Sequence, residues 1–443
     1  MSNKKNILAG ISITILLTYQ LWAWIFAQTI WKNESINYIF FLGSALLFLY
    51  ILFRDRIVIE KKVVGIWLPS LIYILLYAAL AIFAEKIAWW FCCLSLILIA
   101  VNEKITSIVP QKLFVFCGLY GIVGIWVQMF FPQFYFSYIN PLFIKADLLE
   151  NWIDAYGFSG FTYQLDTTAF FIMYFEAIWL YHYKKRVKGW LYWIILILSV
   201  LSIFLTGKRS ISVIAVITPI LVYVLSLRKQ GRTTIYAIIF GLIGFLLVEY
   251  FISNSSYFSD NLFLRRFSDT VESARLGGDI ESGREDLRAM AVKAWLSKPI
   301  FGIGLANYQT VTGAYTDVHN AYLQVLCEQG VVGFTLWIIP LLLCPIYTFK
   351  ALRRSSGGSI ENQWLKFSLF LQIQFILYGF TGNPMSNSDR FIMYFLSIAV
   401  LAEMRYKLYR SNSNRRSLSG YKEKYGNRIK ISRTVTNVEG LKI

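Results

Sequence analysis

Residues 190–227 read WLYWIILILSVLSIFLTGKRSISVIAVITPILVYVLSL. Two apolar runs, at 190–206 and 210–227, flank a short turn that carries two adjacent cations. A helix crosses a bilayer with about 17–25 apolar residues, and each run has that length. Backbone polar groups in lipid must be satisfied within their own segment, so the two runs predict two membrane-spanning helices.

The same pattern recurs along the 443-residue chain. Hydrophobic residues make up 57% of it, charged residues only 15%, and the mean hydropathy is +0.54. A soluble chain carries about 25% charged residues, so the sequence predicts an all-α, polytopic membrane helical bundle. The twelve candidate spans lie at about 7–31, 36–53, 63–84, 87–101, 113–131, 166–183, 190–206, 210–227, 233–252, 320–349, 364–382 and 389–406.

The positions of the basic residues predict the orientation of the bundle. Most of the 43 Lys and Arg fall in the tail and in loops on the same side as the N-terminus. By the positive-inside rule, both termini of this multi-pass protein face the cytoplasm. We expect a transmembrane domain over 1–406, long outer loops at about 132–165 and 253–319, and a basic, disordered cytoplasmic tail over 407–443. This topology explains the net charge of +18 without a nucleic-acid partner.

The turn between the two quoted runs breaks the charge rule, because it places Lys208 and Arg209 on the outer side. Two cations on a Gly-containing turn, followed by the Ser210 hydroxyl at a new helix start, suit a phosphate or pyrophosphate group. The alternative is that both side chains extend from the helix ends to lipid headgroups.

A second group of cations lies late in the long outer loop. Ser282 and Glu285 have capping-box spacing, which predicts a helix that begins there and ends before Pro299. Arg284 and Arg288 share one face of this helix. A cation in the first turn opposes the helix dipole, which favours a binding role for Arg284, whereas Arg288 fits pairing with acids or headgroups equally well. The apolar face predicts a helix lying on the outer membrane surface, and its members are Leu287, Met290, Ala291 and Ala294.

Two further features follow this helix. Gly302 and Gly304 flank one aliphatic residue, which predicts a backbone path close to another element or to a substrate. His319, one of only two histidines, lies where the polar segment re-enters an apolar run. An imidazole titrates near neutral pH and suits proton transfer. The structural alternative is a helix-end histidine that contacts Asp317 or a headgroup.

Acidic residues also fall within the predicted spans. Glu328 lies about 13 Å along the span that follows His319, where an acid is usually functional. It is nearly opposite His319 on an ideal helix, so we expect it to fix a neighbouring helix or loop. We interpret Asp389 and Arg390, at the start of the last span, as an interfacial ion pair. The five cysteines show no metal-ligand spacing, and we expect neither a metal nor a cofactor.

Four short motifs occur in a fixed order in the second half of the chain. They are Ser282-Gly283-Arg284, KPIFGIG at 298–304, HNAYLQ at 319–324 and EQGVVG at 328–333. With the upstream turn, this block covers about 206–337 and resembles the O-antigen ligase/polymerase superfamily. The predicted layout of twelve spans with one large outer loop late in the chain also resembles that superfamily.

The resemblance implies a membrane glycosyltransferase that takes a saccharide from undecaprenyl pyrophosphate at the outer face of the cytoplasmic membrane. Polymerases pass it to another lipid-linked repeat unit of O-antigen, capsule or exopolysaccharide, and ligases pass it to the lipid A core of lipopolysaccharide. By position, His319 would assist the acceptor hydroxyl. The residues implied to bind the donor pyrophosphate are Arg209, Lys208, Arg284 and Arg288, with support from Glu328, Asn320, Gly302 and Gly304. The resemblance leaves open whether Lys208 or Arg209 faces the substrate.

We interpret the chain as a polymerase, because nothing outside the central block indicates a lipid A core site; a ligase is the alternative. A flippase or other saccharide transporter would also have about twelve spans, but would concentrate charge near the bilayer midplane rather than at one face. The partners expected are undecaprenyl-pyrophosphate-linked oligosaccharides, membrane lipids, and a flippase and a chain-length regulator of the same pathway.

Overall fold

The computed structural model describes residues 2–17, 37–52, 60–79, 84–103, 105–143, 157–162, 164–184, 186–227 and 284–425. These residues form helices joined by turns and short irregular segments, with no β-strand among them, which confirms the all-α class. The predicted span at 233–252 and most of the predicted loop at 253–319 lie outside the described residues, as do Ser282 and Gly283.

Each predicted span other than 233–252 overlaps a described helix. The long helices are α1 (Ser2–Leu17), α3 (Asn37–Leu52), α4 (Lys61–Ala79), α5 (Ala84–Glu103), α7 (Gln111–Phe130), α10 (Leu165–Ile178), α11 (Gly189–Leu205), α12 (Arg209–Ser226), α15 (Arg284–Ser297), α17 (Ala321–Arg354), α18 (Ile360–Gly379) and α19 (Ser388–Tyr425). The short ones are α6 (Ile105–Ile108), α8 (Pro132–Phe134), η2 (Tyr135–Ile139), η3 (Asn140–Leu142), η4 (Gly160–Thr162), η5 (Trp179–Tyr183) and α16 (Tyr308–Thr312).

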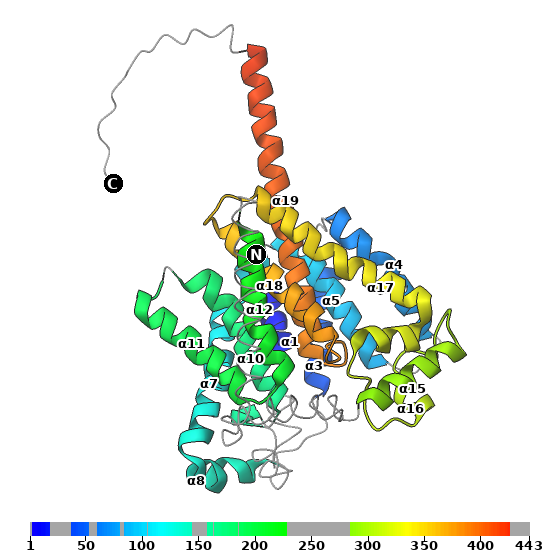
Figure 1. Cartoon of the computed structure of the whole chain (residues 1–443). Coiled ribbons are helices and arrows are strands. Elements are labelled where there is room, and N and C mark those ends of the chain that lie inside the picture. Colours follow the sequence, from blue (N-terminus) through cyan, green and yellow to red (C-terminus); the bar gives the residue numbers. More distant parts are fainter. Residues whose placement is uncertain are drawn as a thin grey trace.

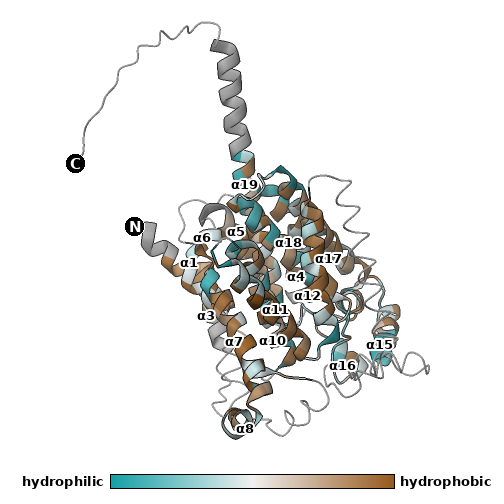
Figure 2. Cartoon of the chain, turned by 60° about the vertical axis from the view of Figure 1, so that its left-hand side comes forward, coloured by the Kyte–Doolittle hydropathy of each residue, from teal (hydrophilic) through white to brown (hydrophobic). Residues whose placement is uncertain are grey.

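Several of these helices suit a bilayer. Within the described ranges, α7, α12 and α17 are long and apolar enough to cross a membrane, and shorter apolar helices cover Ile7–Leu17, Leu42–Leu52 and Gly189–Leu205. Hydrophobic residues cover the flanks of the bundle in Figure 2. These apolar helices indicate a membrane protein. The number of membrane spans stays a prediction.

The helices form one bundle with two different ends. The N-termini of α10, α12 and α19 lie at the lower end in Figure 1, the same end that carries α15 and α16. The start of α1 and the end of α19 lie at the opposite end. α19 continues as a helix to Tyr425, beyond residue 406, where the sequence predicts the membrane domain to end. The first part of the expected tail is thus helical, and 426–443 lies outside the described residues.

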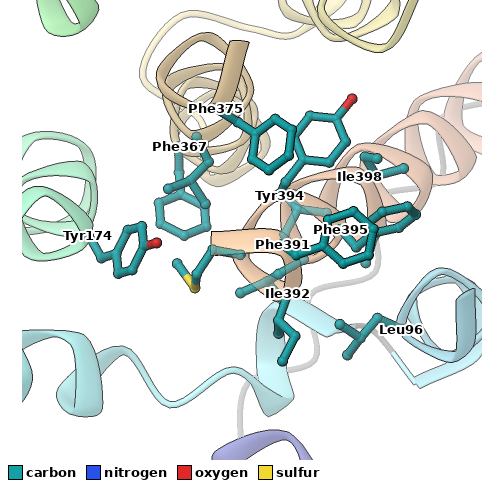
Figure 3. Close-up of a cluster of buried hydrophobic side chains, with 14 of the residues drawn as sticks. Leu96, Tyr174, Phe367, Phe375, Phe391, Ile392, Tyr394, Phe395 and Ile398 are labelled. Carbon is teal, nitrogen blue, oxygen red and sulfur yellow. The ribbon is translucent and has the colours of Figure 1, made fainter. Parts of the chain in front are cut away.

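The core is built around α19, whose residues from 389 to 404 are all buried. Its aromatic side chains pack against α18 on one side and α5 on the other (Figure 3). The rings of Tyr394 and Phe375 stack with centroids 4.4 Å apart, and Phe391 meets Trp90 edge-on at 4.9 Å. This packing fixes the start of α19, and hence Arg390, relative to α5 and α18.

Candidate functional site

The predicted helix after Ser282 is α15, which begins at Arg284. Its apolar face does not lie on a membrane surface, and this part of the prediction is wrong. Leu287, Ala291 and Ala294 are buried in a protein core whose other members are Ile303, Tyr308, Ala314, Val318 and Cys327. Met290 is 41% exposed and does not join them. The helix is therefore docked on the start of α17, and this brings Arg284 to the bundle.

His319 has a strained backbone. It is half-buried, lies immediately before the N-cap of α17, and has φ of +55°. A non-glycine residue in this left-handed region costs on the order of 1–3 kcal/mol and persists only where surrounding contacts hold it. Such positions cluster at functional sites. The contacts that hold His319 are therefore part of the site.

The connection between α18 and α19, residues 380–387, supplies several of these contacts. The amide of Asn320 donates to the Phe380 carbonyl at 3.4 Å, and the Ala321 N–H donates to the Gly382 carbonyl at 3.1 Å. The Asn320 side chain also caps α17 by accepting from the Leu323 N–H. The residues on the C-terminal side of His319 are thus tied to this loop.

The same loop holds two more groups next to His319. The Arg284 guanidinium donates to the Thr381 carbonyl at 3.3 Å, and the Ser386 hydroxyl donates to the Asp317 carboxylate at 2.6 Å. Arg284 and His319 are 35 positions apart in the chain, yet one short loop positions both. Within the described residues, Arg284 forms no ion pair.

Burial and nearby cations lower the pKa of the His319 imidazole. Burial is the main cause, followed by the positive charges of Arg284 and Lys208; the carboxylates of Asp317 and Asp166 oppose the shift. The imidazole therefore stays neutral to a lower pH than an ordinary histidine. A neutral imidazole can accept a proton, which is what a general base requires.

The Lys208–Arg209 turn contributes to this site from a separate part of the chain. Gly207 adopts φ of +67°, and Lys208 is the N-cap of α12, with Arg209 as its first residue. The Lys208 charge acts on both Asp166 and His319. Lys208 therefore contributes positive charge to the site, and whether Lys208 or Arg209 faces the substrate stays a prediction.

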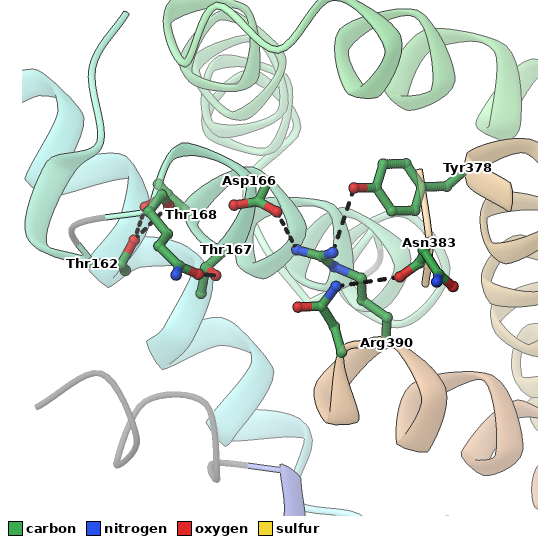
Figure 4. Close-up of polar contacts among 9 residues, drawn as sticks. Thr162, Asp166, Thr167, Thr168, Tyr378, Asn383 and Arg390 are labelled. Carbon is green, nitrogen blue, oxygen red and sulfur yellow. Dashed lines mark hydrogen bonds and ion pairs between the residues drawn. The ribbon is translucent and has the colours of Figure 1, made fainter. Parts of the chain in front are cut away.

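A buried ion pair completes the site, and the sequence does not predict it. The Arg390 guanidinium, 3% exposed, lies 2.7 Å from the Asp166 carboxylate and also donates to the Tyr378 hydroxyl (Figure 4). The Phe170 ring lies beneath its charge at 4.3 Å. The interpretation of Asp389 and Arg390 as a pair is therefore wrong: Arg390 pairs across the bundle with Asp166. The sequence carries one indication of this pair, the acidic Asp166 in the first turn of an otherwise apolar helix.

The site residues share one structural feature: each lies at the N-terminal end of a helix. Asp166 is in the first turn of α10, Lys208 caps α12, Arg284 begins α15, His319 precedes the cap of α17, and Arg390 is in the first turn of α19. A helix N-terminus carries about half a positive charge and free N–H groups, which bind phosphate and other anions. These helix ends lie with Lys208 and Arg284, and they supply anion-binding groups, while Arg390 is paired with Asp166.

The paired glycines have the close backbone path that their spacing predicts. α17 breaks at Gly330, where φ is +66°, and this break leaves carbonyl and N–H groups without helical partners. The segment at 299–304 takes them: Gly304 N–H donates to the Glu328 carbonyl, and Val331 N–H donates to the Pro299 carbonyl, both at 2.9 Å. A Cβ on Gly302 would lie 2.4 Å from the Glu328 carbonyl group. These glycines hold the segment that follows α15, residues 299–304, against α17. They do not face His319 directly.

Two remaining candidates lie further from the imidazole. Arg288 is half-buried one turn beyond Arg284 on α15, and its role stays a prediction. Glu328 is buried and accepts from the Gln324 amide at 2.6 Å. Its carboxylate thus contacts its own helix, and only its backbone carbonyl contacts the 299–304 segment, so a role of the acid in fixing a neighbouring element stays a prediction.

Comparison with known families gives the site its context. Residues 194–338 match the family described as O-antigen ligase. This part of the chain is therefore similar to O-antigen ligases. The match confirms the resemblance to the O-antigen ligase/polymerase superfamily, whose members are membrane glycosyltransferase-like enzymes. No match was found among curated proteins. The matched region contains Lys208, Arg284 and His319, whereas the Asp166–Arg390 pair and the 380–387 loop lie outside it.

Proposed function

We propose that this protein transfers a saccharide from undecaprenyl pyrophosphate to an acceptor hydroxyl, and that it acts as a polymerase of lipid-linked repeat units. The observation that carries the proposal is the meeting of His319, Arg284 and Lys208, from three segments of the chain, at a cluster of helix N-termini. A base and fixed cations are the two elements that this transfer requires.

The chemistry divides between the two kinds of group. The acceptor hydroxyl attacks the anomeric carbon, and its proton passes to the neutral imidazole of His319. The bond from that carbon to the phosphate oxygen breaks, and negative charge grows on the departing pyrophosphate. Arg284 and Lys208 lie where fixed positive charge would stabilise that leaving group. Arg209 and Arg288 would extend the contact to the second phosphate.

The sidedness of the bundle supports an outer site. The start of α1 and the end of α19 lie at the end opposite to the site, as two cytoplasmic termini would require. A cysteine at Tyr315, which is 82% exposed on the site side, should react with an impermeant thiol reagent on intact cells. A cysteine at the exposed Lys188 should not, and the five native cysteines are buried. The reverse labelling pattern would contradict an outer site.

A ligase is the second candidate, because the matching family is described as O-antigen ligase. The two functions share the donor and differ in the acceptor. The repeat-unit polymerase would use a second lipid-linked saccharide and would operate with a flippase and a chain-length regulator. A ligase would use the lipid A core.

The decisive experiment offers both acceptors to the purified protein in lipid nanodiscs, with a lipid-linked saccharide donor and no ion gradient. Longer lipid-linked products indicate a polymerase, and transfer to lipid A core indicates a ligase. A parallel purification from cells that do not express the protein is the control for contaminating activity. Neither product from wild-type protein, together with gradient-driven movement of the donor across liposomes, would contradict transferase function and favour a transporter.

A further inference from the structure

We propose that Gln324 and Glu328 form a buried hydrogen-bond relay that positions His319. This inference rests on the proposed function, because it assigns the relay to the same base. It names Gln324, which the motif pattern leaves without a role, and it gives Glu328 an indirect action on the imidazole through the backbone.

The relay begins in the interior of the first segment of α17. Glu328 is 4% exposed and Gln324 is 6% exposed, and they are one helical turn apart. The Gln324 Nε2 donates to the Glu328 Oε1 at 2.6 Å. The Gln324 Oε1 then accepts from the Val318 backbone N–H at 3.1 Å. Val318 is fully buried and directly precedes His319.

The chemistry of the pair fixes the direction of the relay. An ionised carboxylate only accepts hydrogen bonds, so it selects the NH₂ end of the glutamine amide. The Oε1 of Gln324 must then face the other way, toward the Val318 N–H. Without this acid, the Gln324 amide could rotate by half a turn. Its NH₂ group would then face the Val318 N–H, and two hydrogen-bond donors would meet. Glu328 therefore orients Gln324, and Gln324 holds the backbone.

The hydrogen bond between Val318 and Gln324 matters because of its position directly before His319. His319 adopts a positive φ. In the described part of the chain, the 380–387 loop forms hydrogen bonds with the residues that follow His319 and with the Asp317 side chain, but not with the backbone that precedes His319. The Gln324 bond anchors the backbone immediately before it. With both sides anchored, the left-handed conformation is retained and the imidazole direction is defined. Without the Gln324 bond, the chain before His319 can relax to an ordinary φ and carry the ring away.

The relay is also anchored beyond His319. Gln324 and Glu328 line a small cavity together with Asn383 and Ser386 of the 380–387 loop. The Glu328 carbonyl accepts from Gly304, so the 299–304 segment holds the acid-bearing turn in place. The break at Gly330 follows directly, and it lets this turn of α17 bend away from the rest of the helix.

The first test is Gln324→Leu in the nanodisc transfer assay. Misplacing a catalytic group by about 1 Å costs roughly 10²-fold in rate, so we expect kcat to fall about that much. KM for the donor should change little, because Arg284 and Lys208 remain. The matched control is Gln372→Leu. Gln372 is also fully buried and makes two hydrogen bonds, with Thr348 and Ser368, but it lies within α18 away from the site.

The second test is an exchange of the two side chains. Gln324→Glu alone sets two carboxylates against each other and should lose activity as Gln324→Leu does. Glu328→Gln alone should be mild, because Gln324 can still donate to the new amide oxygen. In the double variant Gln324→Glu/Glu328→Gln, the carboxylate now at position 324 accepts from the Val318 N–H and from the amide now at position 328. The double variant should recover about tenfold over Gln324→Glu, a coupling in the range of contacting residues.

A readout independent of activity separates this proposal from the proposed function. The chain has two histidines, and His182 is 4% exposed, so carbethoxylation by diethylpyrocarbonate reports mainly on His319. We expect Gln324→Leu to raise the reaction rate at His319 several-fold, and Gln372→Leu to leave it unchanged. If the rate rises but wild type transfers no saccharide, the relay stands and the proposed function fails. Wild-type reactivity and wild-type kcat in Gln324→Leu would overturn the relay.

Discussion

The two histidines of the chain lie in regions that differ in almost every physical respect. His182 is buried in η5, with its ring 4.3 Å from Trp364, and neither ring nitrogen has a hydrogen-bond partner in the described part of the chain. His319 is half-buried, has a strained backbone and faces charges from four segments. The first is a packing residue in an aromatic environment. His319 is held in place by hydrogen bonds to the residues on either side of it, which a residue that only fills space would not require.

The difference shows which sequence signals carry function. Both histidines adjoin charged residues in the sequence, since three basic residues follow His182 at 184–186. Only His319 is approached by cations from distant segments, and the sequence predicts this only through the motif block. The comparison can be tested by changing either histidine or the groups around His319.

The largest effect is expected for His319→Ala. Loss of general-base assistance should lower saccharide transfer by about 10²–10⁴-fold. Membrane insertion and thermal stability should be retained, because the His319 side chain is only half-buried and belongs to no hydrophobic cluster among the described residues. Transfer is measured with purified protein, and donor binding is measured separately by retention of lipid-linked saccharide. Normal transfer would make His319 a helix-end contact like the alternative considered above.

Arg284 should come next. Arg284→Ala removes a fixed cation from the leaving group and should reduce kcat by about 10²–10³-fold, the usual value of one preorganised donor. Arg284→Lys keeps the charge but cannot make a planar, bidentate contact with phosphate oxygens, so we expect it to restore only part of the rate. Full activity of the lysine variant would show that charge alone is sufficient at this position.

The fold is the part that sequence predicts well. Apolar runs of the required length coincide with helices because each helix must satisfy its own backbone in lipid. The capping-box spacing predicts a helix before Pro299, and α15 covers Arg284–Ser297 of it, while the cap at Ser282 lies outside the described residues. Its environment was predicted wrongly, because a stripe such as Leu287, Ala291 and Ala294 looks the same whether it meets lipid or protein.

The site is predicted only where its residues lie within one motif block. The Asp166–Arg390 pair joins residues 224 positions apart, and no local pattern links them. The 380–387 loop acts mainly through backbone carbonyls, which any residue type could present. The positive φ of His319 also depends on these contacts. Long-range positioning of this kind requires the folded structure.

Lys208 and Arg209 offer a finer test of the comparison. The resemblance leaves open which of the two faces the substrate, whereas the positive charge of Lys208 acts on His319 and Asp166. A hydrogen bond to a charged group contributes about 1.5–3 kcal/mol, so Lys208→Ala should lower kcat/KM by at least about tenfold. Arg209→Ala should have the smaller effect in the same assay. The opposite order would mean that Arg209 is the residue that contacts the donor.

The pH dependence of transfer should follow His319. Its pKa lies below the ordinary histidine value, so activity should persist as pH falls past that value and then decline as the imidazole protonates. Arg284→Ala removes one cause of the lowering, so the midpoint of its residual activity should move to higher pH. A rate profile for each protein checks this. A midpoint unaffected by Arg284 would place that charge too far from the imidazole to act on it.

The smallest effect is expected for His182→Phe. The ring of His182 packs against Trp364 and Phe367, and its nitrogens make no described hydrogen bond, so a phenyl ring replaces it at similar volume. Volume-conserving changes in a core usually cost less than about 1.5 kcal/mol, and transfer should stay close to wild type. Thermal unfolding and the transfer assay measure the two quantities on one sample. A large loss of transfer without loss of stability would show that both histidines take part in the chemistry, and the distinction between a packing and a reacting histidine would then be wrong.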